Sequence, residues 1–194
     1  MKNEKPVFST VIITPVFRLS YPNIWEPKMN QLAKREQYDI QMLFDKATAK
    51  ASLAEMVKLV NDLIAWKNWT GVAGVRKPFQ DGDKKVNSAG ELNPAYKGMI
   101  LVSSWSKQAP GIVDPTGKHP ITQHDEIYGG CYCRAQVNAY AYEQAGQKGV
   151  NFGLLHIQKI KDGEPFGNRT RAEDAFSPVE NAGASEVSDD KMFG

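Results

Sequence analysis

Residues 132–142 alternate between two kinds of side chain, one of which suits contact with a nucleic acid. Successive side chains of a strand point to opposite faces, so one face here is small and apolar: Cys133, Ala135, Val137, Ala139 and Ala141. The other face carries phenol rings, a guanidinium and amides, from Tyr132, Arg134, Gln136, Asn138, Tyr140 and Tyr142. Such rings stack on bases, and the guanidinium attracts phosphate. A strand face that only meets water is the alternative interpretation.

Further candidates for contact with a polyanion lie outside this stretch. The basic ones are Arg18, Arg76, Lys77, Lys84, Lys85, Lys97 and Lys107. Five of these fall in residues 70–97, an irregular Gly- and Pro-containing segment that predicts either a basic flap over a groove or a solvated hairpin. Trp105 is a stacking candidate if the opposite face of its strand, with Ile100 and Val102, is buried. Otherwise the ring belongs to the core.

The charge of the chain is unevenly distributed. The net charge is +2, but residues 177–194 hold four acids and one lysine, a net of −3, which leaves a net of +5 for residues 1–176. A basic body with an acidic tail suggests a polyanion-binding domain whose tail competes for the site or recruits a partner. Asp189, Asp190 and Phe193 are the tail's candidate residues. A net of +5 is also ordinary for a chain of this length.

Several long strands and one amphipathic helix are expected to position these side chains. The β-like stretches are 7–19, broken at Pro15, then 38–44, 98–106, 132–142 and 150–161. Residues 20–23 predict a turn, and 109–124 a connecting loop. Apolar residues at three- and four-residue steps from Leu53 to Ile64 predict a helix packed on the core, with Ser52 and Glu55 at capping-box spacing.

This order of elements predicts a mainly β protein with one or two helices. The leading candidate is an oligonucleotide-binding (OB) fold, a small β-barrel, here with long loops. We expect one domain over residues 1–176 and a flexible, disordered acidic tail over 177–194. Both cysteines lie in residues 131–133, no apolar run approaches the length of a membrane span, and the first residues lack a signal sequence. These features favour the cytoplasm.

Motifs for catalysis are not found. The phosphate-binding Gly-x-x-x-x-Gly-Lys-Ser/Thr, the zinc-binding His-Glu-x-x-His and the nucleophile Gly-x-Ser-x-Gly are all missing, so we expect neither enzymatic activity nor a cofactor. A zinc set can be imagined from His119, His124, Cys131 and Cys133. However, Cys-x-Cys within a strand departs from the usual spacing of zinc ligands, and two reduced core thiols are the simpler interpretation.

Short segments spread over nearly the whole body resemble a family of tailed-bacteriophage single-stranded DNA-binding proteins, formerly a domain of unknown function. Each is weak alone, but their order and spacing are specific. They are residues 17–23, 26–28, 81–83, 96–98, 110–114, 128–132, 153–154, 158–159, 162–165 and 171–176.

The resemblance implies an OB-fold that coats single strands during phage replication or recombination in the cytoplasm of an infected bacterium. It also implies an acidic C-terminal tail that contacts phage or host replication proteins. This chain departs from the pattern in two ways. The helix falls between the second and third strands, whereas many such barrels place it one connection later. The tail is only sparsely acidic.

We therefore expect a sequence-tolerant single-stranded DNA-binding protein without enzymatic activity. Tyr132, Tyr140 and Tyr142 are expected to stack on bases, and Arg134 to contact phosphate. One alternative is a phage interaction or assembly factor whose tyrosine face binds another protein. Another is a metal-dependent nuclease or deaminase that uses the His/Cys set.

Overall fold

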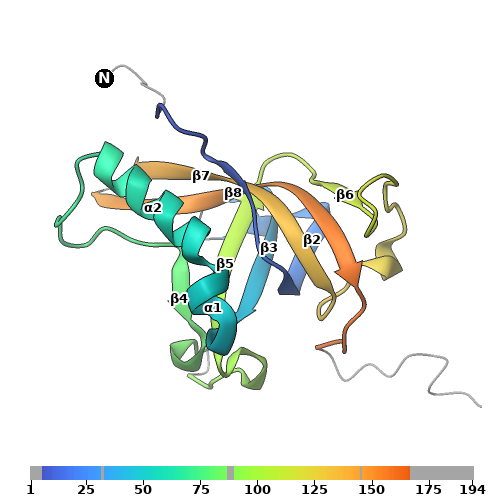
Figure 1. The fold of residues 1–194 in the computed structure, drawn as a ribbon. Coiled ribbons are helices and arrows are strands. Elements are labelled where there is room, and N and C mark those ends of the chain that lie inside the picture. Colours follow the sequence, from blue (N-terminus) through green and yellow to red (C-terminus); the bar gives the residue numbers. More distant parts are fainter. Residues whose placement is uncertain (1–5, 32, 87–89, 145, 167–194) are drawn as a thin grey trace, which may run out of the picture.

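The computed structural model describes residues 6–166, apart from 32, 87–89 and 145 (Figure 1). The strands are β1 Val11–Ile13, β2 Phe17–Asn30, β3 Arg35–Asp45, β4 Phe79–Asp81, β5 Met99–Ser106, β6 Gly111–Val113, β7 Tyr132–Gln144 and β8 Gln147–Lys161. The helices are α1 Lys46–Ser52 and α2 Ala54–Trp66, and three single 3₁₀ turns lie at Gly82–Lys84, Pro94–Tyr96 and His124–Glu126. The expected domain boundary at 176 and the acidic tail lie outside the described residues.

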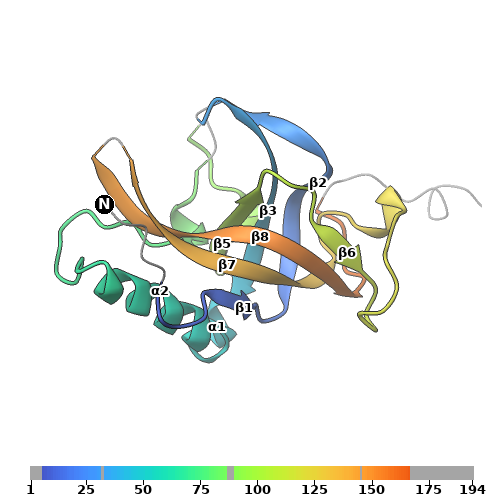
Figure 2. The ribbon, with the colours of Figure 1, turned by 90° about the horizontal axis from the view of Figure 1, so that it is seen from above.

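Five strands close into a barrel. β2 pairs with β3, β3 with β5, β8 with β7, and β7 with β2, all antiparallel, while β5 and β8 pair in parallel. The three short strands extend this ring: β1 beside β7, β4 beside β5 and β6 beside β8. The OB-like barrel predicted from the sequence is confirmed. Figures 1 and 2 show the long β7–β8 hairpin crossing the molecule, with β6 beside it.

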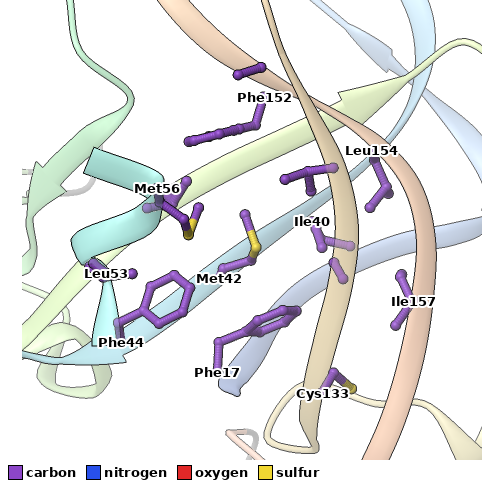
Figure 3. Close-up of a cluster of buried hydrophobic side chains, with 14 of the residues drawn as sticks. Phe17, Ile40, Met42, Phe44, Leu53, Met56, Cys133, Phe152, Leu154 and Ile157 are labelled. Carbon is purple, nitrogen blue, oxygen red and sulfur yellow. The ribbon is translucent and has the colours of Figure 1, made fainter. Parts of the chain in front are cut away.

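The core fills the barrel and is covered by the helices. Met42 and Phe44 of β3 point inward toward Phe17 of β2, and they are covered by Leu53, at the junction of the two helices, and by Met56 of α2 (Figure 3). α1 packs against β3 and β5, and α2 against β7 and β8, so both helices lie along one side of the barrel (Figure 2). They connect the second and third barrel strands, as the sequence indicated.

The start of the helical region differs from the prediction. Of the one or two helices expected, two form, and the first, which precedes the predicted stripe, is capped by Asp45, whose carboxylate accepts a hydrogen bond from the Ala47 N–H at 2.8 Å. Ser52 ends α1, and α2 begins without a side-chain cap. The predicted Ser52–Glu55 capping box is therefore wrong, because the chain is already helical before Ser52.

The predicted turn at residues 20–23 is also wrong, since β2 continues through it. The β2–β3 register shifts between Ser20 and Asn23, and again before Lys28. Tyr21 has φ = 46° at this irregularity. A bulge accommodates Pro22, which has no N–H to donate to a ladder. Two other expected loops contain short strands: β4 lies within 70–97, and β6 within 109–124.

Candidate nucleic-acid interface

The two faces of β7 are those predicted. Cys133, Ala135, Val137 and Ala139 are buried, whereas the tyrosines, amides and Arg134 of the other face are at least partly exposed. Burial raises the pKa of the Cys133 thiol to about 12, so it stays protonated in the core. The alternation therefore places the polar and aromatic side chains of β7 on the outside of the barrel.

A row of residues continues this outer face across the neighbouring strands. In the ladders Asn138 of β7 pairs with Gly153 of β8, which pairs with Trp105 of β5. Trp105 pairs with Asp39 of β3, and Asp39 with Asn23 of β2. We call these five residues the transverse row. It joins the sequence-predicted face of β7 to β3 and β5, which the sequence analysis did not connect with it.

Trp105 lies on the outer side of β5. Val102 and Ser104, from the alternate face, are fully buried, while Trp105 is partly exposed. Of the two interpretations that the sequence left open, the exposed ring is therefore the one observed. Leu101 shares the outer face but is covered by Leu43 and Tyr96, which form a second, small apolar cluster.

Trp105, Tyr140 and Arg35 form one contact group on this face, which we call the Trp105 group. The indole N–H donates to the Tyr140 hydroxyl at 2.8 Å, and the two rings meet edge to face at 86°. The Arg35 guanidinium lies 3.6 Å from the centre of the Trp105 ring, a cation–π arrangement. Burial raises the pKa of the Tyr140 phenol, so it is neutral at physiological pH and accepts the indole hydrogen bond.

A hollow of about 420 Å³ opens beside this group. Its lining comes from β2, β3, β5 and β8: Tyr21, Asn30, Arg35, Gln37, Asp39, Ile40, Gln41, Ser103, Ser104, Trp105 and Asn151. Sequence reasoning missed Arg35, Asp39 and Asn151. The signal available for β3 was its alternation, because Arg35, Gln37, Asp39 and Gln41 face away from its buried apolar residues Ile40, Met42 and Phe44.

Two glycines of β8 make room for the side chains of β7. A Cβ atom on Gly153 would lie 2.3 Å from Oδ1 of Asn138, and one on Gly149 would lie 2.8 Å from the Tyr142 hydroxyl. Asn138 and Tyr142 therefore lie over the neighbouring strand. The Arg76 carbonyl oxygen also approaches Gly149 and accepts from the Val150 N–H at 3.0 Å, so the backbone of this residue, one of the predicted cations, lies beside the β7–β8 hairpin.

A second group of aromatic and basic side chains, the Tyr132 group, lies at the opposite end of β7. The Lys161 Nζ atom is 4.6 Å and the Arg18 guanidinium 5.7 Å from the centre of the Tyr132 ring. Arg18 also donates to the backbone carbonyl of Glu164 at 2.6 Å and lies over the Phe166 ring at 4.3 Å. Nearby, Arg134 donates to Oε1 of Gln158 at 2.6 Å.

The structure does not bring the remaining predicted cations to the transverse row. Lys77 and Lys85 donate to Asn61 of α2 and Gln80 of β4, so they lie toward the helices. Lys84 is exposed in the turn that follows β4. Lys97 and Lys107 are exposed just before and just after β5, at its two ends. The sequence left a basic flap and a solvated hairpin open for residues 70–97; the described part of this segment has all five of its cations exposed, and it does not bring Lys77, Lys84 or Lys85 to the transverse row.

Metal ligands and membrane-spanning helices are the other features that bear on function in the described part of the chain. No group of three or more His, Cys, Asp or Glu side chains there is arranged to hold a metal ion. His124 instead stacks on Trp25 at 4.4 Å, and both cysteines are free and buried. Within the same ranges, the helices are all too short or too polar to span a membrane.

A closed five-stranded barrel with aromatic and basic side chains on its outer face defines the class of OB-like proteins. The family model described as "Enterobacter phage Enc34, ssDNA-binding protein" matches residues 10–191. The chain belongs to this family, which is a family of DNA-binding proteins and not of enzymes. The resemblance stated from the sequence is confirmed.

Individual relatives agree with this assignment. A protein described as "Putative protein p50", from Acyrthosiphon pisum secondary endosymbiont phage 1, is 25% identical over 183 residues, 88% of this chain and 94% of the relative. The single-stranded DNA-binding protein from bacteriophage Enc34, solved in complex with ssDNA, is 26% identical with a TM-score of 0.67, over 81% of this chain and 90% of that one. The gp2.5 protein of bacteriophage T7 shares the fold at 12% identity, with a TM-score of 0.55 over 83% and 97% of the two chains.

Proposed function

We propose that this protein binds single-stranded DNA with little dependence on sequence, by stacking bases on aromatic side chains and neutralising phosphates with cations. The observation that carries the proposal is the Trp105 group, in which an exposed indole, a phenol and a guanidinium meet on the outer face of the barrel. Stacking is sequence-tolerant because every base has a π-face. Membership of the Enc34 family supports the same function.

The proposed binding surface follows the usual face of this fold. OB-folds bind oligonucleotides on the second and third barrel strands and on the loops that join strands one to two and four to five. Here those strands are β3 and β5, and the loops are the β2–β3 tip and the β7–β8 hairpin. We assign stacking to Trp105, Tyr140 and Tyr142, extended by Tyr132. We assign backbone contacts to Arg35, Arg134 and Arg76, with Lys97 and Lys107 as further candidates.

We also propose a role for this binding in the phage life cycle. The protein would coat single strands during phage replication or recombination, in the cytoplasm of the infected host, without enzymatic activity of its own. The segment 177–194, with Asp189, Asp190 and Phe193, would compete electrostatically with DNA and contact phage or host replication proteins. Deleting this segment is expected to tighten binding of a thymine oligomer, whereas unchanged or weaker binding would contradict the competition.

Titration with a single-stranded thymine oligomer, followed by protein fluorescence at low and at high salt, tests the proposal. We expect saturable quenching that weakens steeply with salt, because each neutralised phosphate adds about 0.7 to the slope of log K against log salt on single strands. A duplex of the same length is expected to bind more weakly. If no oligomer changes the fluorescence at low salt, the proposal is wrong and the aromatic face serves another partner, such as a protein.

A further inference from the structure

A carboxylate lies in the middle of the proposed DNA-binding face. Asp39 is the ladder partner of Trp105, and both line the 420 Å³ hollow. Facing positions on neighbouring strands have their Cβ atoms about 4.5–5.5 Å apart, so the carboxylate lies beside the indole ring. An acid at this place needs an explanation, because a surface that only attracted phosphate would carry no negative charge there.

The Asp39 carboxylate is held by amides and not by a cation. Its Oδ1 accepts from the Asn23 amide at 2.6 Å, and its Oδ2 accepts from the Gln37 amide at 2.8 Å. Arg35 orients the Gln37 amide by donating to its Oε1 at 3.3 Å. No lysine, arginine or histidine in the described ranges forms an ion pair with Asp39. The two amides therefore give the carboxylate a defined orientation without neutralising it.

This arrangement leaves acceptor capacity for a ligand. An ionised carboxylate offers about four lone-pair sites, and the two amide hydrogen bonds use two of them. Asp39 is partly exposed, so its remaining sites can face the hollow. Phosphate is repelled by the carboxylate, whereas a base edge that presents an exocyclic amino group is attracted. Cytosine presents its N4 amino group where uracil and thymine present a carbonyl oxygen, and acidic side chains accept from that amino group.

We propose that the hollow beside Trp105 is a base subsite in which Asp39 favours an amino-bearing base such as cytosine over uracil or thymine. This inference rests on the proposed function, since it assigns a preference to one position of that DNA-binding face. The rest of the strand is bound by stacking and charge and stays sequence-tolerant. The carboxylate also sets the orientation of the strand here, with the base turned inward and the phosphate outward.

Cytosine and uracil oligomers of equal length give a sharp test, because these bases are similar in size and differ mainly in the edge read by Asp39. Competition for the wild-type protein against a labelled oligomer is expected to favour deoxycytidine over deoxyuridine by about tenfold, within the range for a good acid–cytosine contact. Equal affinities in the wild type would overturn the inference, and this competition experiment needs no variant.

The variant Asp39→Asn assigns the preference to the carboxylate. It is expected to bring the cytosine-to-uracil ratio close to one, because the amide presents a donor as well as an acceptor. Glu55→Gln is the matched control, since it removes one negative charge from the exposed first turn of α2, and it is expected to keep the wild-type ratio. A thermal unfolding curve checks that Asp39→Asn is folded. A ratio unchanged in the folded variant would overturn the role of Asp39.

The outcomes separate the inference from the proposed function. If the wild type binds neither oligomer at low salt, the proposed function itself fails. If it binds both equally, DNA binding stands and the subsite is wrong. If Asp39→Asn tightens binding of both oligomers by the same factor, the carboxylate acts only as a repulsive charge, and the base preference is again wrong.

Discussion

The two ends of β7 carry similar residues in different settings. Each end has a tyrosine of β7 and an arginine from another strand, Arg18 of β2 or Arg35 of β3. The two tyrosines, Tyr132 and Tyr140, lie about 26 Å apart along the strand, eight residues at about 3.3 Å each. In the Trp105 group, Trp105 and Tyr140 are joined by a hydrogen bond, and the Arg35 guanidinium stacks on the indole beside an open hollow. In the Tyr132 group Arg18 is engaged by backbone carbonyls and by Phe166.

The difference shows that an arginine beside a tyrosine has a different role when its other contacts differ. Arg18 ties the chain after β8 to β2, because its guanidinium reaches Gly130 and Glu164 from the start of β2. Arg35 has a hydrogen bond only to another side chain, Gln37, among the described residues, and its planar group is stacked on an aromatic ring. The first arrangement connects segments of the fold, while the second leaves a guanidinium and an indole together on the face where we propose that DNA binds.

The largest effect is expected from Trp105→Ala. Removing one stacking ring costs about 1–3 kcal/mol of binding, and this change also leaves Arg35 and Tyr140 without their shared partner. Anisotropy of a labelled thymine oligomer measures the loss. Trp105→Phe keeps a ring but lacks the indole N–H, so it is expected to retain most of the affinity.

Tyr132→Ala provides the comparison from the other group. We expect it to weaken binding less than Trp105→Ala, since Tyr132 is flanked by Arg18 and Lys161 and packs near Gly163. A loss as large as that of Trp105→Ala, in a variant with unchanged thermal stability, would show that the two ends of β7 contribute equally.

Gly153→Ala is expected to have the next largest effect. Its new Cβ would lie 2.3 Å from Oδ1 of Asn138, and the amide, being the end of a side chain, can move away without unfolding the strand. If Asn138 hydrogen-bonds to DNA, its displacement costs about 1 kcal/mol of binding. Asn138→Ala should cost about the same, and the double variant no more than either single one. Additive losses would mean that Gly153 acts independently of Asn138.

The sequence was sufficient for some of this arrangement. The alternation in residues 132–142 predicted both faces of β7, because a strand's period of two leaves only one apolar side to bury. The stripe from Leu53 to Ile64 predicted a core-packed helix for the same kind of reason, with Met56 and Val60 fully buried in the structure. Each of these predictions depends only on residues close together in the chain.

The features that sequence reasoning missed depend on which strands are neighbours in the barrel. Arg35 and Asp39 meet Trp105 only because β3 pairs with β5 in one particular register, and a local pattern does not contain that register. Gly153 carries no side chain, so nothing in the sequence indicates that the Asn138 side chain lies over it. The continuation of β2 through Pro22 depends on a bulge that only the pairing with β3 defines.

Arg18→Ala tests the structural side of the comparison. It removes the hydrogen bonds to the carbonyls of Gly130 and Glu164, and the expected loss is about 1 kcal/mol of unfolding free energy. Urea unfolding followed by fluorescence measures it. The salt dependence of DNA binding should stay unchanged, whereas a shallower slope would show that Arg18 contacts phosphate as well.

The smallest effect, and the most specific, is expected from Arg134→Ala. Arg134 is exposed, and its one hydrogen bond to a described residue goes to Gln158, so its loss should leave the thermal stability almost unchanged. If it neutralises one phosphate, the slope of log K against log salt becomes shallower by about 0.7 on single strands, for every oligomer sequence alike. Gln158→Ala is the control, because it frees Arg134 without removing its charge and should keep the wild-type slope. If Arg134→Ala leaves both affinity and slope unchanged, this end of β7 does not contact the DNA backbone, and the binding surface is confined to the Trp105 group and its hollow.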